Sequence, residues 1–200
     1  NMHKMIKETK PDIISVLTES GNHAKNIIEL SKYGKTLIVE KPMALTINDA
    51  EKMIFECKKN GCELFVVKQN RFNNAVFKLK KMIDKKLLGK LFLSTVRVRW
   101  KRDQIYYDQD NWRGTWGLDG GVITNQASHH IDLLEWMMGD VKSVYAKSIN
   151  AIAKTETEDT AVVVLKFKNG GLNFKEYETM LNEIDEWKSG DIFIQKDLAN

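Results

Sequence analysis

Short apolar runs alternate with helical patterns over the first third of the chain. Residues 13–17, 36–39 and 63–67 form nearly continuous apolar runs, which are typical of strands buried on both faces of a parallel sheet. Apolar residues at helical spacing lie between them, first at Ala24, Ile27, Ile28 and Leu30, then at Ile47, Ala50, Met53, Ile54 and Cys57. This alternation with short connections predicts a doubly wound α/β unit.

Turn and capping residues mark the ends of these elements. Gly34 follows the first helical pattern and Asn60-Gly61 follows the second, where C-terminal caps are expected. Thr46 with Asp49 resembles a capping box that opens the second helix. These residues therefore predict where the first helix ends and where the second begins and ends.

The pattern changes after about residue 70. A helix is expected over 74–86, and residues 91–100 alternate between an apolar face and an arginine face, the period of an antiparallel strand. Another helix ends at Met138 with Gly139 as its cap, and strands are expected over 141–148 and 160–167. Residues 174–187 look helical. The second part is predicted to be α+β with a mostly antiparallel sheet, so we place domains at 1–69 and 70–200.

Composition narrows the class of protein. The 200 residues are 42% hydrophobic and 29% charged with a formal charge of +4, close to an ordinary soluble domain. No apolar run approaches the ~18 residues of a membrane span, and the N-terminal residues lack a signal-peptide core. Two cysteines suit a reducing compartment, so we expect a cytoplasmic protein without membrane contact.

The first candidate for chemistry is the segment Glu40-Lys41-Pro42, just past the carboxyl end of a predicted parallel strand. Ligands bind at that edge of open α/β sheets. A lysine there can direct a charge at a bound group, and a glutamate can accept two sugar hydroxyls. The alternative is a solvated turn at the end of a strand.

The second candidate begins at Gly120-Gly121 and contains Asn125 and His129, four residues apart and so expected on one helical face. An imidazole between core and cleft can transfer protons near neutral pH. The alternative is a histidine with a satisfied structural hydrogen bond. His130 with Asp132 suggests a metal, but their spacing matches no metal motif, so no metal site is predicted.

The third candidate is the loop over 101–121, which is rich in aromatic residues and arginines. Rings stack on sugar faces, and guanidinium groups bind carboxylate or phosphate. The alternatives are a loop packed onto the sheet, or a surface for single-stranded nucleic acid. The interleaved Asp103, Asp108 and Asp110 argue against nucleic acid.

Together these motifs resemble one family, the glucose-fructose oxidoreductase, inositol dehydrogenase and MocA group of NAD(P)-dependent oxidoreductases. The first motif reads Thr18, a loop, His23, and then Glu40-Lys41-Pro42; the second reads Gly120-Gly121, Asn125 and His129. The resemblance covers roughly residues 1–170. It implies the C-terminal part of a dinucleotide-binding Rossmann domain, followed by a substrate and oligomerisation domain.

The resemblance also implies roles for individual residues. His129 would be the general base, and Lys41 would polarise the reacting hydroxyl beside the nicotinamide. Thr18, His23, Glu40 and Lys41 would bind the cofactor, NAD with NADP as the alternative. The family also implies association into homo-oligomers.

Within the family, the chain is most similar to the sugar-nucleotide branch, the UDP-N-acetyl-2-amino-2-deoxyglucuronate dehydrogenases. The segments 68–73, 106–107 and 112–116 carry this similarity. It implies oxidation of the C3 hydroxyl of a UDP-N-acetyl-aminosugar uronate in surface polysaccharide (lipopolysaccharide) biosynthesis. The substrate would contact Arg71, Tyr107, Arg113, Asn125 and His130.

Two departures from the family leave alternatives open. Nothing in the sequence matches the Gly-x-Gly-x-x-Gly turn of a dinucleotide fold, and few residues follow the turn at 167–171. One alternative is therefore a truncated, non-catalytic remnant that binds a sugar nucleotide or a partner subunit. The other is a polyol or inositol dehydrogenase of the same family, against which the loop 112–115 argues.

Overall fold

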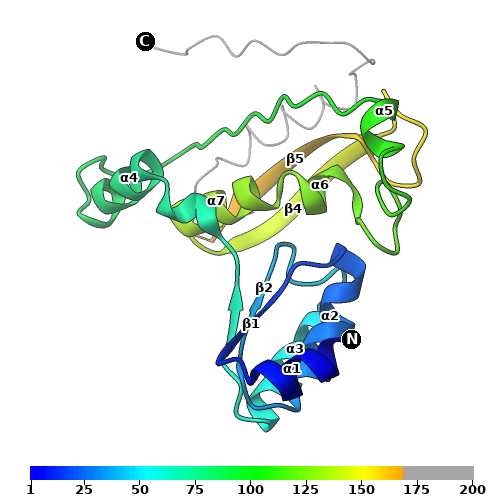
Figure 1. Ribbon diagram of the computed structural model, residues 1–200. Helices are drawn as coiled ribbons and strands as arrows, with labels where there is room; N and C mark the ends of the chain where they lie inside the picture. Colours follow the sequence, from blue (N-terminus) through cyan, green and yellow to red (C-terminus); the bar gives the residue numbers. More distant parts are fainter. Residues whose placement is uncertain (169–200) are drawn as a thin grey trace, which may run out of the picture.

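The computed structural model describes residues 1–168 as two units joined by one passage of the chain (Figure 1). The first contains α1 (Met2–Thr9), β1 (Ile13–Val16), η1 (Ser20–Asn22), α2 (His23–Ser31), β2 (Thr36–Val39), α3 (Ile47–Lys59) and β3 (Leu64–Val66). The second contains η2 (Gln69–Phe72), α4 (Asn74–Asp84), α5 (Gln104–Tyr107), α6 (Gly121–Asn125), α7 (Ser128–Met138), β4 (Val141–Ile149) and β5 (Thr160–Phe167). We call them the parallel unit and the antiparallel unit.

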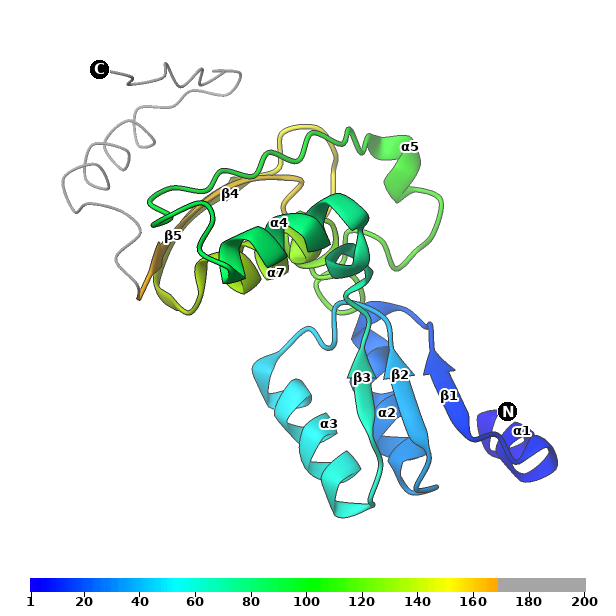
Figure 2. The ribbon, with the colours of Figure 1, turned by 90° about the vertical axis from the view of Figure 1, so that its left-hand side faces the viewer.

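The sheet of the parallel unit confirms the predicted α/β order. β2 lies in the centre, paired in parallel with β1 through Ile14↔Leu37 and with β3 through Val39↔Val66. Figure 2 shows the carboxyl ends of all three strands pointing toward the antiparallel unit. Any residue that directly follows one of these strands is therefore carried to the junction between the units.

The core of the parallel unit lies on one face of this sheet. Alternate strand positions, Ile14 and Val16 on β1 and Leu37 and Val39 on β2, pack against residues of α1, α2 and α3. The expectation that 13–17 is buried on both faces is wrong within residues 1–168, because Ile13 and Leu17 are 56% and 70% exposed. The helices of this part of the chain supply apolar partners to one face only.

The helical spacing predicted α3 well but overestimated its buried face. Met53 and Cys57 are buried, and Thr46 caps the helix by accepting a hydrogen bond from the Asp49 N–H at 3.1 Å. Ile47 and Ile54, expected inward, are instead 78% and 55% exposed. The face of α3 that packs into the core is therefore narrower than its apolar pattern predicts.

The antiparallel unit contains both strands predicted after residue 140, β4 and β5. They pair antiparallel, with Val144 opposite Leu165 and a register irregularity near Val141. α6 contacts β5, and α7 ends at Met138 with Gly139 at φ 88° as its cap, as predicted. No helix of residues 1–168 is long and apolar enough to cross a membrane.

The strand expected over 91–100 is not formed within the described part of the chain. These residues run without a hydrogen-bonded ladder, and Phe92 and Trp100 are 65% and 58% exposed. Alternation predicts an extended backbone, but a strand also needs a pairing partner, which the sequence pattern does not specify. The helix expected over 174–187 lies outside the described residues.

A tight contact between backbones joins the two units beside β1. The Gly21 N–H donates to the carbonyl oxygen of Leu118 at 3.0 Å. A Cβ atom at Gly21 would stand 1.9 Å from the carbonyl oxygen of Gly117. Only glycine therefore permits this approach of η1 to the loop that precedes α6.

We expect Gly21→Ala to lower the free energy of unfolding by about 1–3 kcal/mol, because the added methyl group forces two backbone segments apart. Gly117→Ala is the matched control, since a Cβ there meets nothing within 4 Å. Urea unfolding followed by circular dichroism measures both variants. Equal stability of the two variants would contradict this description of the junction.

Candidate functional site

The central strand of the parallel sheet delivers Glu40 and Lys41 to the junction. The Glu40 N–H continues the ladder by donating to Val16 O at 3.1 Å, and the Lys41 N–H donates to Glu40 Oε2 at 3.0 Å. A cis peptide bond joins Lys41 to Pro42. The Lys41 ammonium then donates to both the main-chain O and the side-chain Oδ1 of Asn125, each at 2.8 Å. Residues 84 positions apart thus meet across the two units.

Asn125 is held from behind by a buried carboxylate. Its amide Nδ2 donates to Oδ1 of Asp119, and Oδ2 of Asp119 accepts from the Gly114 N–H at 2.7 Å. Asp119 and Asn125 are only 4% and 9% exposed. The side chain that Lys41 contacts is therefore fixed by groups of the antiparallel unit alone.

The backbone conformation explains why positions 120 and 121 are both glycine. Gly120 and Gly121 have φ of 86° and 82°, in the left-handed region that favours glycine. A Cβ at Gly121 would stand 2.3 Å from a carboxylate oxygen of Glu158. That carboxylate accepts from the Ile123 N–H at 3.0 Å, and Glu158 O accepts from the Val122 N–H. Glu158 thus satisfies the first turn of α6, the helix that ends in Asn125.

His129 lies on a different helix from Asn125. The expected single helix is interrupted at residues 126–127, where the N–H groups of both Gln126 and Ala127 donate to Val122 O, and α7 begins at Ser128. His129 is 8% exposed. Its Nε2 lies 3.4 Å from Nε2 of Gln69, while its Nδ1 is buried without a hydrogen-bond partner. An amide nitrogen only donates, so in this contact Nε2 of His129 is the accepting atom.

Burial and charge shift the two ionisable groups of the junction. Burial lowers the pKa of the His129 imidazole, and the nearby ammonium groups of Lys41 and Lys68 lower it further. Burial also lowers the pKa of Lys41, although the carboxylates of Glu40 and Asp119 oppose that shift. Near neutral pH, His129 is therefore a neutral base beside an ammonium group that releases its proton more easily than an exposed lysine.

Thr18 and His23 shape the loop after β1. The His23 ring is 1% exposed, and its two nitrogens lie 2.7 Å from Pro42 O and 2.9 Å from Thr18 O. The Thr18 hydroxyl accepts from Asn26 Nδ2 at 3.0 Å. His23 thus connects the loop after β1 with the turn at Pro42, and its role in cofactor binding stays a prediction.

Arg71 is paired inside the antiparallel unit. Its guanidinium donates to both carboxylate oxygens of Asp132 at 2.8 and 2.7 Å and lies 5.1 Å from the centroid of the Trp136 ring. Lys68 approaches the same carboxylate at 3.7 Å. Asp132 thus anchors η2 to α7 through Arg71, and the contact of Arg71 with a substrate stays a prediction.

The aromatic loop is packed through its own side chains. Arg113 donates to Asp110 Oδ2 at 2.8 Å and to the Tyr106 hydroxyl at 2.6 Å. Tyr107 packs edge-on against Tyr106, and burial followed by the charge of Asp119 raises the pKa of the Tyr107 phenol to about 12. His130 packs edge-on against Trp100, at 6.1 Å between ring centroids, and its contact with a substrate stays a prediction.

Four residues of the site carry roles that the sequence patterns did not assign: Gln69, Asp119, Asp132 and Glu158. Asp119 immediately precedes the glycine pair, and Asp132 is one helical turn beyond His129. An acidic residue directly before a pair of glycines is a signal that could have selected Asp119. Glu158 lies 35 positions from the N–H that it caps, and no local pattern points to it.

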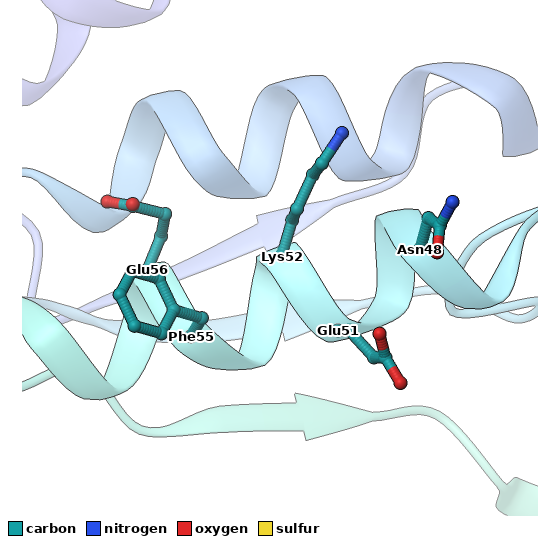
Figure 3. A pocket seen from close by; sticks show the side chains of 5 residues that line it. All are labelled: Asn48, Glu51, Lys52, Phe55 and Glu56. Atoms are coloured by element: carbon teal, nitrogen blue, oxygen red, sulfur yellow. The ribbon is translucent and has the colours of Figure 1, made fainter.

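The other candidate surfaces lack comparable chemistry. Within residues 1–168, no three His, Cys, Asp or Glu side chains are grouped as a metal ion requires. A surface hollow of about 270 Å³ is lined by Asn48, Glu51, Lys52, Phe55 and Glu56. Figure 3 shows that all five side chains project from α3. An open hollow on one helix offers no convergent polar groups, so we place the functional site at Lys41 instead.

The residues at the strand ends fit a nicotinamide cofactor. Oε1 of Glu40 has no hydrogen-bond partner within residues 1–168, so it can accept from a ribose hydroxyl. The third N–H of the Lys41 ammonium is likewise unused in this part of the chain. Both lie at the carboxyl edge of the parallel sheet, where dinucleotides bind in open α/β folds.

Two family models match the chain. Residues 1–68 match the GFO/IDH/MocA oxidoreductase family with its NAD-binding Rossmann fold. Residues 76–175 match the GFO/IDH/MocA C-terminal domain. The two matches follow each other in the order of the parallel and antiparallel units.

Solved structures and curated relatives agree with these matches. The WlbA dehydrogenase of Bordetella pertussis, crystallised with NADH and UDP-GlcNAcA, is 39% identical with a TM-score of 0.81, over 87% of this chain and 53% of that chain. The WlbA dehydrogenase of Chromobacterium violaceum, with the same two ligands, is 41% identical with a TM-score of 0.81, over 86% and 51%. The myo-inositol 2-dehydrogenase of Thermotoga maritima is 30% identical over 85% of this chain and 50% of its own. The chain thus spans about half the length of these relatives.

We expect Lys41→Met to raise the pKa of His129, because a positive charge that disfavours the imidazolium is removed. Lys25→Met, which changes an exposed lysine of α2, is the matched control and leaves that pKa unchanged. An NMR titration of the histidine ring signals measures both variants. An unchanged His129 titration in Lys41→Met would show that the two side chains do not share one site.

Proposed function

The chain belongs to the GFO/IDH/MocA family of oxidoreductases, and on that basis we propose that it transfers a hydride from a sugar-nucleotide hydroxyl to NAD. The substrate class is a UDP-N-acetyl-aminosugar uronate, oxidised at C3. The observation that carries the proposal is the meeting of Lys41 with Asn125 across the two units, close to the neutral imidazole of His129.

The parallel unit would bind and orient the cofactor. Glu40 supplies a carboxylate oxygen for the nicotinamide ribose, and Lys41 stands at the end of the central strand. Thr18 borders the same edge after β1, held by His23. The bound cofactor supplies the hydride acceptor, which no protein side chain can replace.

The antiparallel unit would supply the base. His129 is neutral near pH 7 because burial and two ammonium groups disfavour its protonated form. Its Nε2 lone pair faces only the amide of Gln69 at 3.4 Å, a long contact that a substrate hydroxyl can replace. His129 then accepts the hydroxyl proton, while the Lys41 ammonium stabilises the developing negative charge on that oxygen.

The similarity to the two WlbA dehydrogenases supports the sugar-nucleotide substrate, because their crystals hold UDP-GlcNAcA. The loop of Tyr106, Tyr107 and Arg113 offers rings and a guanidinium group toward such a ligand, with Arg113 already oriented by Asp110. A product of this kind would serve surface polysaccharide synthesis. Association of like chains belongs to the same proposal.

A polyol or inositol substrate is the second candidate, favoured by the 30% identity to the myo-inositol 2-dehydrogenase. An uncharged polyol gives Arg113 no carboxylate to bind, so the two candidates differ in their dependence on that residue. Binding of a sugar nucleotide or a partner subunit without turnover is the third candidate.

The test is a titration of the purified chain with NADH by fluorescence, followed by turnover of NAD with UDP-GlcNAcA and with myo-inositol at 340 nm. We expect NADH binding and faster NADH formation with the sugar nucleotide. Preference for myo-inositol supports the second candidate, and NADH binding without turnover of either substrate supports the third. A folded chain that binds no NADH would contradict the proposal.

If the unmodified chain forms NADH with either substrate, we expect Lys41→Met and His129→Gln to lower kcat by roughly 10²–10⁴-fold with a small effect on NADH affinity. The two residues move or stabilise the reacting proton rather than hold most of the cofactor. Lys58→Met serves as the control, since it removes an equal charge from an exposed position in the last turn of α3. Near-normal kcat in both site variants would show that the roles are misassigned.

A further inference from the structure

Asp119 is a buried carboxylate that the proposed mechanism does not use. It is 4% exposed, and both of its oxygens are occupied, Oδ2 by the Gly114 N–H at 2.7 Å and Oδ1 by the Asn125 amide. Its own N–H donates to Thr115 O at 3.1 Å. The carboxylate therefore has no freedom to turn toward another partner.

We propose that Asp119 is a positioning residue, which fixes the direction of the Asn125 amide and thereby the place of the Lys41 ammonium group. The structural part of this inference stands on the contacts alone, and its effect on rate rests on the proposed function.

Hydrogen-bond polarity fixes the orientation of the Asn125 amide. A carboxylate only accepts, so the end of Asn125 that faces Asp119 must be the donating Nδ2. The accepting Oδ1 is then necessarily at the other end, where it meets the Lys41 ammonium at 2.8 Å. If the amide were reversed, its NH₂ group would face an ammonium that has only donors, and the contact between the units would be lost.

The charges around Lys41 favour the same position of its ammonium group as the hydrogen bonds do. The charged groups acting on the Lys41 ammonium are Glu40 beside it on the parallel unit, Asp119 beyond Asn125 on the antiparallel unit, and Lys68, which opposes both. Asp119 is thus the carboxylate that holds the ammonium toward the antiparallel unit. A carboxylate at position 125 would place a second negative charge against the buried carboxylate of Asp119. The neutral amide of Asn125 avoids this repulsion and separates Asp119 from the Lys41 ammonium.

The test is a set of three isosteric variants. In Asp119→Asn, Oδ1 of the new amide still accepts from Gly114, and its NH₂ group then faces the NH₂ group of Asn125, which must reverse toward Lys41. In Asn125→Asp, two carboxylates meet. In the double variant, the carboxylate introduced at position 125 accepts both from the amide introduced at position 119 and from Lys41. Every donor then faces an acceptor again, from the Gly114 N–H through positions 119 and 125 to the Lys41 ammonium.

Two readouts need no turnover. One is the side-chain amide signal of Asn125 in nitrogen-15 NMR, which a hydrogen bond to a carboxylate displaces. The other is the pH dependence of Lys41 acylation, read by mass spectrometry. We expect Asp119→Asn to move the amide signal and to make Lys41 react at lower pH, and we expect the double variant to restore the Lys41 profile. Asp108→Asn, an exposed carboxylate of the same loop, is the matched control.

The outcomes separate this inference from the proposed function. An Asp119→Asn chain with an unchanged amide signal and Lys41 profile overturns the positioning role, whatever the activity. A restored Lys41 profile in the double variant without turnover in any chain supports the role and contradicts the function. In an active chain, we expect Asp119→Asn to lose about 10²-fold in kcat and the double variant to regain most of it. If Asp119→Asn does not fold, a folded double variant supports the role and an unfolded one overturns it.

Discussion

The arrangement of the two units depends on one requirement: the half-buried ammonium group of Lys41, at the junction, needs hydrogen-bond acceptors. An ammonium that loses water must find acceptors, and the parallel unit, which carries Lys41, does not supply them within residues 1–168. Asn125 of the antiparallel unit supplies two at 2.8 Å. The requirement that joins the units is therefore also the one that assembles the site.

The same contact explains why the neighbouring groups have the protonation states that the proposed hydride transfer needs. His129 is buried and Lys41 half-buried, and the positive charge of Lys41 disfavours protonation of the His129 imidazole. Carboxylates at Glu40 and Asp119 keep the charge on the lysine, which leaves the imidazole neutral. A cation beside a neutral base is the arrangement that removes a proton from a hydroxyl and stabilises the resulting oxygen.

Local patterns predicted the elements of the fold, and long-range contacts determined what those patterns could not. The parallel strands, the Thr46 cap and the Gly139 cap follow from residues within a few positions of each other. Strand-end position and helical spacing selected Lys41, Asn125 and His129 as candidates, and the resemblance supplied their roles. The hydrogen bond that joins the first two spans 84 positions, which no local pattern predicts. The pairing of Arg71 with Asp132 and the missing ladder at 91–100 likewise depend on partners distant in sequence.

The most direct test of this account is a crystal structure of the chain grown with NADH. The account predicts that the nicotinamide ring lies at the ends of the parallel strands, between Lys41 and His129, with Glu40 on its ribose. A ring bound elsewhere, such as against Phe55 on α3, would contradict it. So would a chain that keeps the Lys41 contact to Asn125 and holds no cofactor at saturating NADH.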